Sequence, residues 1–230
     1  MSIFITILGH VLTLLGAITG IFGETYDPKK KRKIKLTRLG WTAAIVASLG
    51  ISLTIYKSVD DYLTSKVYEE IALKDIKTGW RQVASIFFLL EWEVKGEKSK
   101  VSINAIKNIR DSGMLAKFDQ VNFKNKTKVI QYAEWNLGQL ACKQTSMGMR
   151  IMESAVRAND ERISRDIAEK VQKLRQSPVF GKLLAAGCGT TVERKPNYEL
   201  FKGMFNTEEM KSYLSLLIEL GNELGNPGKK

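Results

Sequence analysis

A single histidine, His10, carries most of the acid–base chemistry that this sequence offers near neutral pH. Imidazole is the side chain whose ordinary pKa lies closest to physiological pH, so a histidine can relay protons or gate a pathway. His10 lies inside an apolar run, where an ionisable group is costly and a functional role becomes a hypothesis. The simpler interpretation, which we favour, is a neutral imidazole that hydrogen-bonds to Ser48, Ser52 or a backbone carbonyl.

The two cysteines, Cys142 and Cys188, form no CxxC motif and have no histidine near them in the chain. Their spacing gives neither a zinc site nor a thioredoxin-like motif. We therefore interpret them as two buried free thiols. A disulfide is the alternative if this part of the chain lies in an oxidising compartment.

No catalytic arrangement is recognisable elsewhere in the sequence. A nucleophile elbow, an HExxH motif and paired carboxylates in a glycine-rich setting are all missing. The glycine-rich stretch around Cys188 lacks the Gly-Lys-Ser context of a phosphate loop. We expect a protein that is not an enzyme and that uses no cofactor or metal.

Two apolar segments near the start of the chain position His10 and dominate the fold. Residues 3–22 carry no formal charge, and about 20 such residues suffice for a helix to cross the hydrocarbon core of a bilayer. The second segment, 39–56, has about 18 residues. A cleaved signal peptide is the alternative for the first segment, but no basic region precedes it and no small-x-small site precedes Glu24. Aromatic rings expected at the headgroup level are those of Tyr26, Trp41 and Tyr56.

The loop between the segments, residues 24–38, is strongly basic. Its seven positive charges are Lys29, Lys30, Lys31, Arg32, Lys33, Lys35 and Arg38. Short loops rich in Lys and Arg remain in the cytoplasm, which would leave both flanking regions on the outer face. Each basic residue could also contribute about 1 kcal/mol of attraction to anionic headgroups.

Small residues recur at four-residue steps in both segments and predict close helix packing. They are Gly16 and Gly20 in the first segment and Gly40, Ala44, Ser48 and Ser52 in the second. In lipid, such faces let helix backbones approach closely. We favour packing of the two helices against each other, and the alternative is self-association between copies, which a membrane-disrupting assembly would require.

The remainder of the chain, residues 58–230, predicts a mostly helical polar domain, so the expected fold is all-α. The net charge is +12 for the whole protein, and half of this excess lies in residues 1–57. The polar domain is therefore only mildly basic. The second segment is expected to continue as one long helix with a bend near Gly79. Further expected helices are 101–109, 129–157, the charged segment 157–176 with its narrow apolar stripe, and a final helix to about 220 after a capping box at 206–209. Residues 183–189 are expected to be a helix end or a loop, and a weak strand pair is the alternative for 190–194 and 198–201.

The hairpin resembles that of a known group of proteins. The motif residues are Gly23 to Asp27, the lysine run, and Leu36 to Trp41, with Tyr26 where the pattern often has Trp. This resembles the hairpin of small bacterial two-transmembrane proteins, some of which look like effectors of anti-phage systems, including one partnered with a retron reverse transcriptase. The resemblance covers about the first 57 residues.

The resemblance implies a multi-pass protein of the bacterial inner membrane that acts in abortive infection. A partner, either a regulatory protein or a reverse transcriptase with its RNA and DNA, would hold the effector silent until infection. The spans would then perturb the bilayer, and residues 58–230 would sense or bind the partner. The charge rule places this domain outside, whereas a retron complex is cytoplasmic, so its side stays open. The alternative function is a constitutive membrane anchor or scaffold whose helical domain recruits a partner protein.

Overall fold

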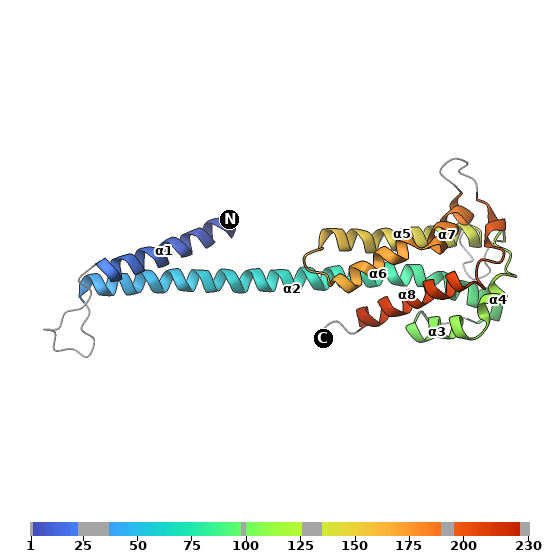
Figure 1. The fold of residues 1–230 in the computed structure, drawn as a ribbon, viewed down its shortest axis with the longest axis horizontal. Helices are drawn as coiled ribbons and strands as arrows, with labels where there is room; N and C mark the ends of the chain where they lie inside the picture. The colour runs from blue at the N-terminus through green and yellow to red at the C-terminus, as the bar shows by residue number, and fades with distance from the viewer. Residues whose placement is uncertain (1, 23–36, 98–99, 126–134, 190–195, 226–230) are drawn as a thin grey trace. The chain divides into compact units, whose positions relative to one another are not determined.

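The computed structural model is all-helical, and the described residues include no β-strand (Figure 1). These residues are 2–22, 37–97, 100–125, 135–189 and 196–225; side-chain surroundings are described for neither 2–6 nor 20–22. The chain divides into two compact units, Met1–Val67 and Tyr68–Lys230, which we call the N-terminal and C-terminal units. The expected all-α class is confirmed.

The N-terminal unit consists of α1 (Ser2–Phe22) and the first part of α2 (Arg38–Lys95), which lie side by side (Figure 1). Thr37 caps the N-terminus of α2. Its Oγ1 accepts a hydrogen bond of 3.1 Å from the backbone amide of Gly40, and its carbonyl accepts one of 3.0 Å from the backbone amide of Trp41. Threonine is a favoured residue at such a helix start. The expected boundary at 57/58 falls inside α2, as does the boundary between the two units.

The C-terminal unit is a bundle of helices around the second part of α2 (Figure 1). Its other elements are α3 (Ile103–Asp111), α4 (Met114–Phe118), α5 (Leu137–Ala158), α6 (Arg165–Gln176), α7 (Pro178–Cys188), η1 (Tyr198–Phe201) and α8 (Glu208–Gly225). α5 packs against α6 and α7, while α8 packs against α3 and α6. Polar side chains cap several of these helices: Asn136 and Gln139 form a capping box at α5, and Ser102, Ser164 and Ser177 accept from amides of α3, α6 and α7.

Large side chains fill the core of this unit. Phe87 on α2 and Tyr213 on α8 are fully buried, and their ring centroids lie 6.5 Å apart. The indole Nε1 of Trp80 donates a buried hydrogen bond of 2.7 Å to the carbonyl of Leu217. Burial raises the pKa of the Tyr213 phenol, whose hydroxyl has no hydrogen-bond partner among the described residues.

Two glycines let α2 and α5 cross closely. A Cβ on Gly79 would lie 2.6 Å from Cγ of Met152, and one on Gly148 would lie 2.9 Å from Cγ2 of Val83. α2 runs through Gly79 as one uninterrupted helix, which confirms the expected continuation of the second apolar segment. The small residue at this position serves the helix contact.

Several expected boundaries need correction. The described part of the predicted 129–157 helix begins at Leu137, because the capping box starts there, and 129–134 lie outside the described residues. Residues 183–188 form the C-terminal end of α7 and Gly189 caps it, so of the two expected alternatives the helix end is confirmed. α7 begins at Pro178, an N1 residue preorganised for a helix. The expected strand 198–201 is the 3₁₀ helix η1, and its partner 190–194 lies outside the described residues.

The last helix also differs from the prediction. α8 begins at Glu208, and Oγ1 of Thr207, not Asn206, accepts a hydrogen bond of 3.2 Å from the Met210 amide. The amides of Phe205 and Asn206 are held instead by the Asp119 carboxylate, at 2.9 and 3.2 Å. α8 continues to Gly225. Within it, Gly221 packs against the Trp80 ring, and a Cβ added to Gly221 would come within 2.8 Å of that ring.

Candidate functional site

The first candidate site is the contact between α1 and α2 in the N-terminal unit. A Cβ added to Gly16 would come within 2.7 Å of the Ala47 Cβ, and one added to Gly9 within 2.9 Å of Oγ1 of Thr54. A Cβ on Gly50 would meet the Gly9 carbonyl at 2.8 Å. The two backbones are therefore in direct contact, as small residues permit in lipid.

The residues of α2 that make this contact differ from the predicted face. Gly40 is buried, whereas Ala44, Ser48 and Ser52 are exposed. The contact follows alternating steps of three and four residues through Gly40, Ala43, Ala47, Gly50 and Thr54. A four-residue step drifts around a helix by about 40° each time, whereas this alternation stays on one side. Sequence reasoning missed Gly9, Ala47, Gly50 and Thr54, which the alternating spacing could have revealed.

Other predicted residues are placed as follows. Gly20 lies in α1, but its surroundings are not described, and Tyr26 and Lys29 to Lys35 lie outside the described residues. Arg38 is exposed at the start of α2. The rings of Trp41 and Tyr56 are 48% and 66% exposed, which leaves both free to contact a headgroup region.

The outer surface of the two helices is apolar. Large exposed apolar side chains on α1 include Ile7, Val11, Leu14 and Ile18, and those on α2 include Leu39, Ile45, Leu49, Ile51 and Ile55. Among the described residues, α2 is long and apolar enough to cross a membrane, and Ile7–Thr19 forms a shorter apolar helix. A water-exposed surface of this kind is unusual, so the unit is typical of a membrane-associated segment.

His10 lines a groove of about 370 Å³ between the two helices. Thr13, Leu14 and Ala17 of α1 and Ile51, Thr54 and Ile55 of α2 complete the groove. The hydroxyls of Thr13 and Thr54 each donate a 2.9 Å hydrogen bond to a carbonyl of their own helix. Ser48 and Ser52, the expected partners of His10, do not line this groove.

A charged cluster follows the apolar part of α2. Lys57 is buried, with its Nζ bonded to Asp61 and 3.5 Å from Oδ2 of Asp60. The hydrogen bond that the Lys57 ammonium donates to Asp61 raises the pKa of Lys57. Both aspartates are more than half exposed, and because exposed carboxylates are costly in hydrocarbon, we expect this turn of α2 to mark the end of the apolar span.

In the C-terminal unit, Cys142 of α5 and Cys188 of α7 form a disulfide, with their Cα atoms 5.8 Å apart. The interpretation as two free thiols is wrong. The bond forms because glycines bring α5 and α7 together: a Cβ on Gly187 would lie 2.6 Å from the Cys142 Cβ, and Gly138 faces the same crossing. This proximity links residues that are far apart in sequence and could not be read from it.

A cavity of about 570 Å³ adjoins the disulfide. Its lining combines apolar side chains such as Met147 with the cations Lys143 and Arg150. Nζ of Lys143 lies 3.4 Å from the centre of the Trp135 ring, a cation–π contact. This surface suits an anionic or aromatic group of a partner.

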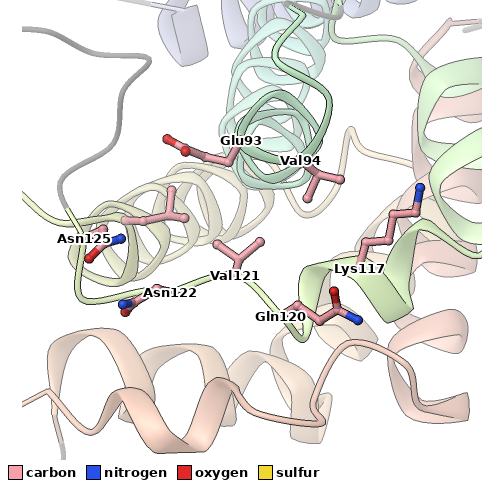
Figure 2. A pocket seen from close by; sticks show the side chains of 8 residues that line it. Glu93, Val94, Lys117, Gln120, Val121, Asn122 and Asn125 are labelled. Atoms are coloured by element: carbon pink, nitrogen blue, oxygen red, sulfur yellow. The ribbon is translucent and has the colours of Figure 1, made fainter.

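A second cavity, of about 470 Å³, lies where α2 ends (Figure 2). Figure 2 shows Glu93 and Lys117 pointing away from each other, with Val121 between them. The side chains of Gln120, Asn122 and Asn125, which also line the cavity, carry amide groups that can donate and accept hydrogen bonds. Among the described residues, no three His, Cys, Asp or Glu side chains gather as metal ligands would.

Comparison of the chain with protein-family models, curated protein sequences and solved structures finds no match.

Proposed function

We propose that this protein is a membrane-embedded effector whose N-terminal unit perturbs the bilayer after copies associate. The observation that carries this proposal is that α1 and α2 pack through one small-residue face while a second, comprising Ala44, Ser48 and Ser52, stays exposed. A helix pair that served only as an anchor would need just the first face. The second face is suited to contact between copies within lipid.

The resemblance of the hairpin to two-transmembrane effectors suggests the biological setting. The protein would be held silent by a partner complex and released during phage infection, so that its spans depolarise the bacterial inner membrane. Both α1 and α2 would cross the bilayer in this proposal, with the loop 24–38 in the cytoplasm.

The disulfide supports a location of the C-terminal unit on the outer, oxidising face. Disulfides persist in the periplasm and are rare in the cytosol. The basic loop favours the same topology, and it does so through residues unrelated to Cys142 and Cys188. A cytoplasmic partner made of protein and nucleic acid would then reach the basic loop rather than the C-terminal unit.

The redox state of the two cysteines, trapped by acid precipitation of whole cells, tests this topology. A thiol-reactive polymer is expected to leave the chain unmodified when added after denaturation without reductant, and to modify two thiols after reduction. Two thiols that react without reduction, in cells able to form periplasmic disulfides, would contradict the outer location.

A constitutive anchor is the second candidate function, and the cavity beside Trp135 and Lys143 favours it. A partner that binds there would be recruited to the membrane without any action of the spans. Such a protein should be tolerated when it is expressed without its partner.

Induced expression in a bacterium that lacks related systems separates the two functions. A potential-sensitive dye and viability counts are followed together. The effector should depolarise the membrane and kill, and Ser48→Leu with Ser52→Leu should abolish both effects without disturbing the contact to α1. Thr42→Leu is the matched control, because Thr42 is also exposed but points to another side of α2. Normal potential and growth with confirmed insertion of the wild-type chain would refute the autonomous effector.

A further inference from the structure

The disulfide of the C-terminal unit has one buried end and one accessible end. Cys142 lies within α5 and is fully buried, whereas Cys188 is exposed at the C-terminal end of α7. Cys188 and the preceding Gly187 line the cavity of about 570 Å³ beside the disulfide, and Cys142 is not among the described residues that line it. A molecule in this cavity therefore reaches the disulfide from the side of Cys188.

One face of α5 lines the same cavity and makes it cationic. Among the described lining residues, the charged side chains are those of Lys143 and Arg150, two turns apart on α5, and no carboxylate lies with them. Nζ of Lys143 lies over the Trp135 ring, and within the described ranges neither cation is paired with a carboxylate. The positive charge at this cavity is therefore available to an anion that enters it.

An accessible disulfide sulfur beside two cations fits the chemistry of thiol–disulfide exchange. In this reaction a thiolate attacks one sulfur of a disulfide and displaces the other, so access decides which sulfur is attacked. The attacking species is an anion, because the thiolate and not the thiol is the nucleophile. A cavity that exposes Cys188 next to Lys143 and Arg150 therefore favours attack at Cys188 by an anionic molecule.

We propose that Cys188 is a site of exchange with small thiols that carry a further anionic group, such as a peptide thiol with free carboxylates. The thiolate sulfur of the incoming molecule bonds to Sγ of Cys188, and the bond from Cys188 to Cys142 breaks. Cys142 leaves as a thiolate and takes a proton from water. The incoming sulfur is oxidised and the Cys142 sulfur is reduced, so no further oxidant or reductant is needed. Lys143 and Arg150 bind the anionic group of the incoming molecule.

The exchange changes the C-terminal unit in two ways. It removes the covalent link between α5 and α7, and it leaves the added group attached to Cys188 in the cavity. The helices stay in contact through Gly187, where an added Cβ would lie 2.6 Å from the Cβ of Cys142. This inference goes beyond the proposed function and does not rest on it, because the site lies entirely in the C-terminal unit.

Exchange kinetics with thiols of different charge test the proposal. The purified full chain in detergent, with its disulfide formed, is treated with mercaptoethanesulfonate, which is anionic, or with mercaptoethanol, which is neutral. Samples are quenched with acid, and peptide mass spectrometry locates the adduct. Each initial rate is divided by the rate of the same thiol with an uncharged small disulfide, which removes differences in intrinsic nucleophilicity. On this scale the anionic thiol should react several-fold faster, and the adduct should be on Cys188.

Charge-neutralising variants identify the source of this preference. Lys143→Gln and Arg150→Gln should each reduce the advantage of the anionic thiol, and the double variant should remove it. Arg157→Gln is the matched control, because Arg157 is exposed on the same helix but is not among the residues that line the cavity. Circular dichroism checks that each variant is folded.

Three results would overturn the inference. They are equal normalised rates for the two thiols, an adduct mainly on Cys142, and an advantage of the anionic thiol that survives the double variant. An advantage that Arg157→Gln reduces as much as Arg150→Gln would assign the preference to the net charge of the protein, and this would overturn the inference as well. Membrane depolarisation is measured separately, so none of these results bears on the proposed effector.

Discussion

The two units use the same kind of element in opposite ways. In the N-terminal unit, small residues such as Gly16 and Gly50 lie at the helix contact, and large apolar side chains point outward. In the C-terminal unit, large side chains such as Phe87 and Tyr213 fill an enclosed core. A single helix, α2, contributes to both arrangements.

The proposed membrane location of the N-terminal unit would account for this inversion. In water, burying large apolar side chains is the main favourable term, so they collect inside. In lipid, that term vanishes between helices, and close packing of backbones and hydrogen bonds replaces it. On this proposal, the side on which α2 carries its large residues would differ between the lipid segment and the aqueous segment.

A large-to-small substitution is expected to give the largest difference in the free energy of unfolding between the two units. Phe87→Ala should lower the free energy of unfolding of the C-terminal unit by about 3–5 kcal/mol, because it opens a cavity in a closed core. Leu49→Ala, at a side chain that is 54% exposed in the N-terminal unit, should leave this value unchanged. Denaturant unfolding of the purified chain, followed by tryptophan fluorescence, measures both. Equal losses would mean that the outer apolar surface of α2 is also a core.

Removal of the disulfide should have the next largest effect. Cys142→Ala with Cys188→Ala is expected to lower the stability of the C-terminal unit by about 2–4 kcal/mol, because the bond closes a loop across residues 46 apart. Reductant should reproduce the loss in the unaltered chain and have no effect on the double variant. A reductant-insensitive melting temperature in the unaltered chain would show that the bond is not formed.

The sequence predicted the helical class well because periodicity survives in almost every segment of this chain. Local caps at Ser102 and at the pair Asn136 and Gln139 fix where two helices begin, but the predicted helix starts did not use them. Local rules failed at Asn206, whose amide is held by Asp119 from a distant part of the chain. The sequence contains no local signal for such a contact.

The candidate sites were less predictable for the same reason. The disulfide depends on how Gly138 and Gly187 bring two helices together, which is a tertiary fact. The cavity beside Trp135 combines residues of α5 and α7 with Trp135, which precedes α5, and Pro196, which follows α7. In the N-terminal unit, two spacings of small residues coexist on α2. The predicted face followed the four-residue repeat, whereas the alternating repeat contacts α1.

The smallest expected effect comes from overpacking the contact between α1 and α2. Gly16→Val should push α1 away from α2, because its Cβ would lie only 2.7 Å from that of Ala47. Overpacking of this kind costs about 1–3 kcal/mol. The neighbouring control Ala17→Val adds similar bulk on the groove side, where the residue is exposed, and should leave the pair intact.

Spin labels attached at Leu15→Cys and Leu49→Cys, both exposed side chains, report the separation of the two helices in nanodiscs. The distance distribution should lengthen and broaden with Gly16→Val and stay unchanged with Ala17→Val. If both variants leave it unchanged, backbone contact does not hold α1 and α2 together, and the contrast between the two units would no longer rest on small residues. A response to Ala17→Val alone would instead assign the tight contact to the side of the helix pair that carries His10.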